Sequence, residues 1–288
     1  MTIISKNRLV VGGKNTMKKY PIGFNTRIKE ETDINIPMEV CKGVIEPKKS
    51  VVQVYFPSRG MNLAYYNDSF DLKVGDLVYV DGKLEGHRGQ VTEVNYSFKI
   101  KLSDYKKVIA VIDTNVKGEL YFAGSHLVSF DRNTIPFEKV KTWFKAPEGD
   151  EEYATSTDST KKFPLDDLTQ MNISHDIADR GHDYYMDNKV AYISIDNNHG
   201  YAIVEGSEAY EVEFDYNEGE ISNLICSCFC SYSCKHEFAA MLQLRETLEF
   251  ITKNYENEHN DYFAAISKNI FMSIIMSKKE SGKISVGV

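Results

Sequence analysis

The chain of 288 residues is 42% hydrophobic and 26% charged, with a formal net charge of −8 at pH 7. These are the proportions of an ordinary globular protein, so they exclude a mainly disordered chain, and the length suggests two domains. The first residues carry charges without a long apolar run behind them, and nowhere do eighteen apolar residues occur in succession. This argues against a secretion signal and a membrane-spanning helix, so we expect a cytoplasmic protein without a membrane partner.

The charges are unevenly divided along the chain. Residues 1–147 contain 23 Lys and Arg against 16 Asp and Glu, a balance of +7, whereas the remainder contains 11 against 26, a balance of −15. A basic half and an acidic half favour different partners for each half, or contact between the two. The alternative is a pair of unevenly charged, solvated surfaces.

The first half is rich in short β-forming runs. Residues 34–40 could form one strand, which Pro37 would restrict to a sheet edge. Further apolar runs occupy residues 51–56, 63–66, 77–80, 90–94, 108–112 and 120–122. Their spacing of roughly ten residues, with turn residues between them, predicts a small antiparallel β-barrel or sandwich, of which we favour the barrel. We therefore expect a mainly β, basic N-terminal domain over residues 1–146.

A basic loop in this predicted barrel is a candidate nucleic-acid site. The segment 74–80 resembles the small β-barrels attached to nucleic-acid-processing proteins, and the loop that follows it carries Lys83, His87 and Arg88. Four tyrosines lie on neighbouring predicted strands, namely Tyr65, Tyr66, Tyr79 and Tyr96. Cations beside exposed aromatic rings attract phosphates and stack on bases, so this loop could bind single-stranded nucleic acid. Alternatively, the tyrosines fill a core and the cations are solvated.

An acidic, polar segment over residues 147–162 has the composition of a linker. After it, residues 173–186 have nearly helical apolar spacing, with Ser174 as a candidate N-cap. We interpret His175 and His182 on that helix, and His199 in a later turn, as surface residues. Period-two runs at 190–195, 201–204, 209–214 and 221–225 then predict a sheet of about four strands.

Four of the five cysteines lie in an eleven-residue stretch directly after this sheet. Thiolates and imidazoles are the ligands that zinc prefers, and short spacers let two ligand pairs converge on one ion. Cys226 with Cys228 and Cys234 with His236 form such pairs, so we predict that these four residues bind Zn2+. Cys230, in the loop between the pairs, is expected to stay free.

The ligand spacing C-x-C-x5-C-x-H resembles the SWIM zinc finger. The residues before it resemble the helix-to-strand lead-in of bacterial SWIM proteins, and they are Arg180, Gly181, Tyr184, Tyr185, Lys189 and Val190. The resemblance implies an α+β fold over residues 163–288, in which a helix and a sheet precede the zinc site and a helix follows it. SWIM proteins differ widely in what they do, so the resemblance specifies the metal and leaves the function open.

Two further helices are expected after the zinc ligands. A run that begins at His236 places Phe238, Met241, Leu242, Leu248 and Ile251 on one face. Residues 261–277 are predicted to form a last helix that packs on this domain or on a partner. The first of these helices would be fastened to the sheet by the metal.

The sequence favours a binding module over an enzyme. Four good ligands close a zinc site, whereas a catalytic zinc keeps one position open, and no nucleotide-binding or serine-type catalytic motif is present. The zinc domain would bind protein in preference to nucleic acid, because its acidic strands repel phosphate, and the basic half would add affinity for nucleic acid. The alternative is a thiol-based redox or metal-transfer protein that uses Cys226, Cys228 and Cys230.

Overall fold

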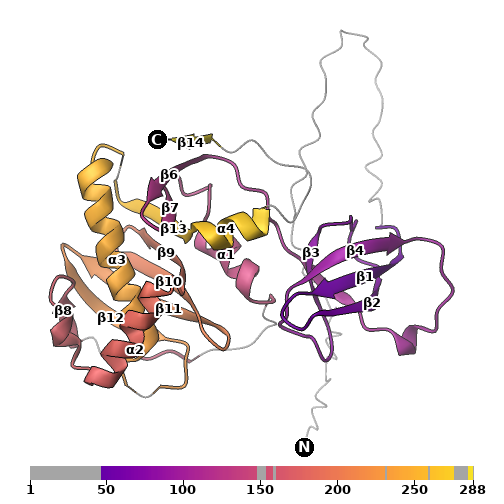
Figure 1. Cartoon of the computed structure of the whole chain (residues 1–288), viewed down its shortest axis with the longest axis horizontal. Helices are drawn as coiled ribbons and strands as arrows, with labels where there is room; N and C mark the ends of the chain where they lie inside the picture. The colour runs from indigo at the N-terminus through magenta and orange to yellow at the C-terminus, as the bar shows by residue number, and fades with distance from the viewer. Residues whose placement is uncertain are drawn as a thin grey trace, which may run out of the picture. The chain divides into compact units, whose positions relative to one another are not determined.

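A computed structural model describes residues 47–147, 154–157, 160–230, 232–258, 260–275 and 285–287. The strand predicted at 34–40 and half of the predicted linker lie outside these residues. The described chain is an α+β arrangement of two β-sheets with four α-helices (Figure 1). None of the described helices is long and apolar enough to cross a membrane.

The first sheet has five antiparallel strands in the order β2-β1-β4-β3-β5. The strands are β1 (Ser50–Phe56), β2 (Met61–Asn67), β3 (Leu77–Val80), β4 (Gly89–Asn95) and β5 (Val108–Val111). Val52, Val54 and Phe56 alternate along β1 and are fully buried, so the predicted period of two is observed.

The predicted closed barrel is not formed in the described residues. The edge strands β2 and β5 meet at one isolated bridge, between Tyr66 and Lys107, and the Tyr66 amide donates to the Lys106 carbonyl at 2.9 Å. A single bridge is not a continuous ladder, so the sheet stays open between these two edges. The expectation is therefore corrected to an open, curled sheet.

The second sheet has nine described strands in the order β14-β6-β7-β13-β9-β10-β11-β12-β8. Its strands are β6 (Glu119–Ala123), β7 (His126–Ser129), β8 (Lys162–Pro164), β9 (Val190–Asp196), β10 (His199–Glu205), β11 (Ala209–Asn217), β12 (Glu220–Cys226), β13 (Tyr262–Ser267) and β14 (Ser285–Gly287). All pairings in it are antiparallel except that of β14 with β6. The four strands predicted from the period of two are β9 to β12.

Residues 119–129 were expected in the N-terminal domain, but β6 and β7 belong to the second sheet. The strand β13 causes this difference, because it pairs with β7 on one side and with β9 on the other. The pairing of β13 with β7 joins segments more than 130 residues apart, so no local sequence pattern predicts it. That residues 147–162 link two separate domains stays a prediction.

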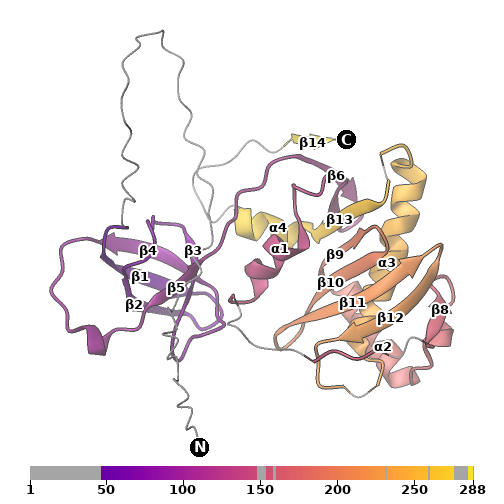
Figure 2. The same ribbon diagram turned by 180° about the vertical axis from the view of Figure 1, so that it is seen from behind.

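Helices cover both faces of the second sheet. On one face, α2 (His175–Met186) and α3 (Lys235–Asn254) lie side by side across β9 to β12 (Figures 1 and 2). Buried residues from alternate positions of the strands, such as Ile193 and Phe263, pack with α3. On the other face, Tyr192 and Ile266 pack with α1 (Phe137–Phe144) and α4 (Lys268–Ile275).

The predicted helix at 261–277 is wrong over its first half. Residues Tyr262–Ser267 form the central strand β13, in which all six residues are buried, and only Lys268–Ile275 is helical. A strand with both faces covered is a continuous apolar run, which periodicity alone does not separate from a buried helix. Because helices lie on both faces of β13, its side chains show no alternation.

Candidate metal centre

The candidate centre lies between the end of β12 and the start of α3. Backbone contacts hold the end of β12 in place: the Ser227 amide donates to the Glu211 carbonyl at 2.8 Å, and Ser227 Oγ accepts from the Glu211 amide at 2.9 Å. Cys226 is the last residue of β12, and Cys234 is the N-cap residue of α3. The strand end and the helix start therefore each carry one ligand pair.

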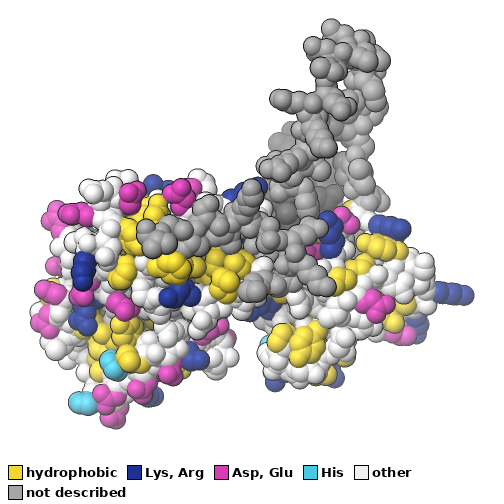
Figure 3. Space-filling view, turned by 45° about the horizontal axis from the view of Figure 1, so that its top comes forward, with side chains coloured by type: hydrophobic (Ala, Val, Ile, Leu, Met, Phe, Trp, Pro, Cys, Tyr) yellow, Lys and Arg dark blue, Asp and Glu magenta, His cyan; other side chains and the backbone are white. Residues whose placement is uncertain are grey.

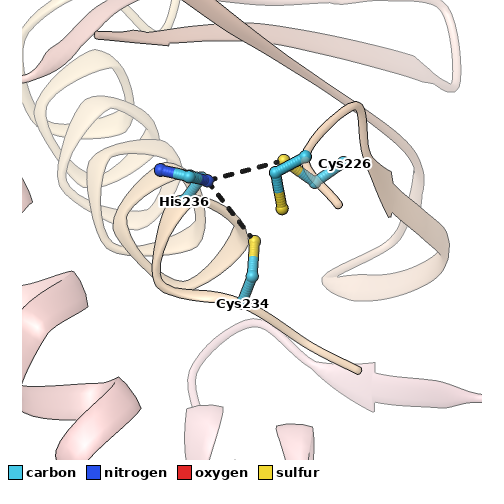
Figure 4. Close-up of side chains that lie close together, drawn as sticks. Cys226, Cys234 and His236 are labelled. Atoms are coloured by element: carbon cyan, nitrogen blue, oxygen red, sulfur yellow. Dashed lines mark hydrogen bonds between the residues drawn. The ribbon is translucent and has the colours of Figure 1, made fainter. Parts of the chain in front are cut away.

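The structure brings Cys226, Cys228, Cys234 and His236 together. Their four ligand atoms all lie within 4.8 Å of one another. His236 Nδ1 is 3.8 Å from Cys226 Sγ and 3.8 Å from Cys234 Sγ, and Figure 4 shows the imidazole pointing towards both sulfur atoms. With Zn–S bonds of about 2.3 Å, a tetrahedral site has donor-to-donor distances of roughly 3.8 Å. The four donors are thus close to the spacing that a zinc ion requires.

Cys230 lies outside the cluster. Its side chain is exposed, whereas Cys234 is buried and Cys226 and Cys228 are partly buried. The structure therefore separates the loop cysteine from the other three, as the spacing predicted.

The chemistry of the sulfur atoms also fits a cation. Hydrogen bonding from Cys226 lowers the pKa of Cys234 to about 4, and the same contact, together with burial, raises the pKa of Cys226 far above its usual value. Burial raises the pKa of Cys228 to about 12. Three thiolates at this separation repel one another, which opposes the loss of a proton from each of the three thiols. A bound divalent cation would let all three thiols lose their protons.

Glu237 closes the start of α3 through a capping box. Its carboxylate accepts from the Cys234 amide at 2.9 Å, while its own amide donates to Cys234 Sγ at 3.4 Å. Burial raises the pKa of Glu237 to about 8, and the negative charge of Cys234 adds to the shift. The first turn of α3 thus holds the Cys234 sulfur at the positive end of the helix dipole.

The imidazole of His236 is fixed by two tyrosines. Its ring stacks on Tyr210 with centroids 4.1 Å apart, and it meets the edge of Tyr184 at 5.5 Å. The ring is only 4% exposed, and its Nε2 atom is buried without a hydrogen-bond partner in the described part of the chain. Aromatic packing therefore holds the ring so that Nδ1 faces the sulfur atoms.

Sequence reasoning missed Glu237, Tyr184 and Tyr210 as supporting residues. The spacing Cys234-x-x-Glu237 is a capping box with a cysteine in the usual Ser or Thr position, so a local signal was present. Tyr210 lies on β11 and reaches His236 only through the fold. No local pattern predicts that contact.

The predicted nucleic-acid residues do not form a matching site. Arg88 donates to the Trp143 carbonyl at 2.7 Å, and His87 Nε2 lies 3.3 Å from an Arg59 nitrogen. Lys83 is exposed in a turn. Of the four tyrosines, Tyr65, Tyr66 and Tyr79 are buried, and only Tyr96 is exposed. Three of the four rings are therefore unavailable for stacking on a base.

The three other histidines named from the sequence lie on the surface. His175 and His199 have side chains 86% and 70% exposed, and each lies within 3 Å of a neighbouring carboxylate, Asp179 and Asp215 respectively. His182 is also exposed. None of them is part of the metal cluster.

Comparison with known proteins leaves the family open. No protein-family model matches the chain, and no solved structure matches it. A similar protein is an uncharacterized protein of Methanocaldococcus jannaschii, which is 30% identical over 107 residues. The match covers 36% of this chain and 46% of the relative, so the chain spans less than half the length of the curated relative it matches.

Proposed function

We propose that the protein is a non-enzymatic binding module of the SWIM type, in which Cys226, Cys228, Cys234 and His236 hold one structural Zn2+ ion. The observation that carries the proposal is the set of four donors within 4.8 Å between β12 and α3. Four such ligands fill a tetrahedron and leave no position for a substrate or a reactive water. The metal would supply the positive charge that lets the thiolates share one site, and so fasten α3 to the sheet.

The loop between the two ligand pairs supports a role in recognition. Phe229 is fully exposed and Tyr232 is 84% exposed. It is unusual for a surface without a partner to expose two large aromatic side chains on one short loop. Aromatic residues are enriched in protein interfaces. Ligands on both sides of the loop hold its ends, which reduces the entropy lost on binding.

A protein partner is favoured for the metal domain. Residues 148–288 carry a net charge of −15, which opposes the approach of phosphates. On the face drawn in Figure 3, acidic side chains are spread over the region of the second sheet, with basic side chains between them. A nucleic-acid role for the basic half, through Lys83, His87 and Arg88, has less support, because Arg88 is engaged with Trp143 and most of the tyrosines are buried.

The alternative is thiol-based redox or metal-transfer chemistry. Its supporting observation is the exposed thiol of Cys230, which lies two residues from the ligand Cys228. Reactive cysteines are exposed and have a low pKa, whereas Cys226 and Cys228 are partly buried and have raised pKa values. Structural zinc therefore agrees better with the surroundings of these two sulfur atoms.

Elemental analysis of single Cys→Ser variants tests the assignment. The wild-type chain should contain one zinc ion, Cys226→Ser and Cys234→Ser should lose it, and Cys230→Ser should retain it. Loss of zinc in Cys230→Ser with retention in Cys234→Ser would show that the ligand set is wrong. Substoichiometric zinc that exchanges freely with chelators would favour the redox or metal-transfer alternative.

Titration with a labelled single strand and a labelled duplex tests the nucleic-acid role of the basic half. Electrostatic binding should be detectable at about 50 mM salt and should fall steeply as salt is added. Binding that is lost in a Lys83→Glu variant would support that role. Failure of both probes at low salt would leave protein recognition as the function.

A further inference from the structure

The second half of α3 forms the floor of a groove that the metal centre does not use. One hollow of about 670 Å³ is lined by α3, by the residues that follow β8, and by the turn between β11 and β12. A second hollow of about 420 Å³ continues it between α3 and α2. The two share Asp166, Arg245 and Glu249 in their linings, so they adjoin, and together we call them the α3 groove.

The α3 groove is long enough for a short extended peptide. Its lining runs from Leu242 to Lys253 along α3, which corresponds to about 16 Å at the helical rise of about 1.5 Å per residue. An extended peptide rises about 3.3 Å per residue. The groove therefore matches about five residues of a bound strand.

The floor of the α3 groove is apolar and its rim is acidic. Leu165, Tyr216 and Leu248 supply apolar surface. Five acidic side chains line the two hollows, against the two cations Arg245 and Lys253, and they are Asp166, Glu218, Glu220, Glu246 and Glu249. The lining thus carries a net charge of −3 when His182 is neutral.

Three of these carboxylates are free to meet a ligand. In the part of the chain that the structure describes, Asp166, Glu218 and Glu249 are exposed and form no ion pair, whereas Glu220 is paired with Lys162 at 3.1 Å. Unpaired acids around an apolar floor complement a cationic ligand with an apolar anchor. They also repel the phosphates of nucleic acid and of anionic lipids.

We propose that the α3 groove binds a short, extended, Lys- or Arg-rich peptide segment of a partner protein, with one or two apolar side chains seated on Tyr216 and Leu248. This deepens the function proposed above, since it rests on a protein partner for the metal domain and names its chemistry. The metal ligands Cys234 and His236 begin the same helix that forms the groove floor. A metal bound there would hold the floor in place at one end.

The test is a selection of ten-residue peptides from a random phage-displayed library against the zinc-loaded full chain. Selected peptides should be rich in Lys and Arg around apolar residues. Fluorescence anisotropy of one labelled selected peptide should show binding that weakens as salt is raised, because the attraction is between exposed charges. Selection of no peptide, or of acidic peptides, would overturn the proposal.

Matched charge reversals locate the binding. The double variant Asp166→Lys/Glu249→Lys should weaken binding at least about tenfold, since it replaces two attractions at the rim by two repulsions. The control Glu93→Lys/Glu213→Lys changes the net charge equally at two exposed acids outside the groove, and should change binding less than about twofold. Equal losses in both variants would refute the groove as the site.

Zinc content, measured on each preparation, separates the two proposals. Stoichiometric zinc without groove-dependent peptide binding would reject the α3 groove alone and leave the metal module standing. A chain without stoichiometric zinc that still binds the selected peptides would reject the metal module and keep the groove. An exposed-site variant, Thr252→Arg, checks the result independently, because a bulky cation on the groove lining should also weaken binding.

Discussion

Replacement of Gly181 by alanine tests the packing that supports the metal centre. Gly181 is the buried residue of α2, and it faces the first turn of α3. A Cβ atom there would lie 2.9 Å from the Lys235 carbonyl oxygen and 2.8 Å from Phe238 Cδ1. Lys235 lies between the ligands Cys234 and His236. The clash therefore acts on the backbone that carries two ligands.

The change in the free energy of unfolding that Gly181→Ala causes is the sum of two opposing contributions. Ordinary contacts begin at 3.4 Å, so α2 and α3 must separate by about 0.5 Å to relieve the contact with the carbonyl oxygen. Overpacking of this kind costs about 1–3 kcal/mol, while alanine in place of glycine inside a helix contributes about 1 kcal/mol of stability. We expect a net loss of up to about 2 kcal/mol in the free energy of unfolding. Zinc affinity should fall about tenfold, as it does when residues that position metal ligands are changed.

Thermal unfolding and competition with a chromophoric zinc chelator measure these two quantities. Asp183→Ala, at an exposed position of the same helix, is the control and should change stability by no more than about 0.5 kcal/mol. If Gly181→Ala binds zinc as tightly as the control and unfolds at the same temperature or higher, the close contact between α2 and α3 does not position the ligands. That result would refute the reasoning.

Three further predictions concern the metal, a buried histidine and the central strand. Removal of metal by a strong chelator should lower the melting temperature, and zinc but not magnesium should restore it, because thiolates bind zinc and not hard cations; an unchanged melting curve would contradict this. Burial lowers the pKa of His126 from 6.5 to about 4. As the pH drops from about 6.5 to 4, His126 therefore takes up a proton in the unfolded chain before it does so in the folded chain. This lowers the contribution of His126 to the free energy of unfolding by up to about 3 kcal/mol. Urea unfolding across this pH range should show that, as the pH falls, wild type and the exposed-site control His175→Gln lose stability relative to His126→Gln. Phe263→Ala should cost about 3–5 kcal/mol because Phe263 is fully buried in β13, while Met272→Ala at a half-exposed position of α4 should cost far less; equal effects would argue against β13 as a core strand.

Local patterns in the sequence were sufficient to predict the strands and the helix next to the candidate metal site. The spacing of the three cysteines and His236 predicted the cluster that the fold brings together, because short spacers let such side chains converge. The alternation of apolar residues in 190–225 predicted β9 to β12, and the apolar stripe from His236 predicted α3. The residues that produce each of these patterns lie within a few positions of one another in the sequence.

The tertiary structure decided what depends on contacts between distant segments. β13 was predicted as helix because helices on both of its faces remove the alternation that marks a strand. The segment of β6 and β7 was placed in the N-terminal domain because β7 pairs with β13, which lies more than 130 residues further along the chain. The tyrosines of the first sheet were candidates for stacking until their burial was known. The rings that fix His236, and the apolar floor of the α3 groove, come from separate elements, so only the assembled fold brings them together.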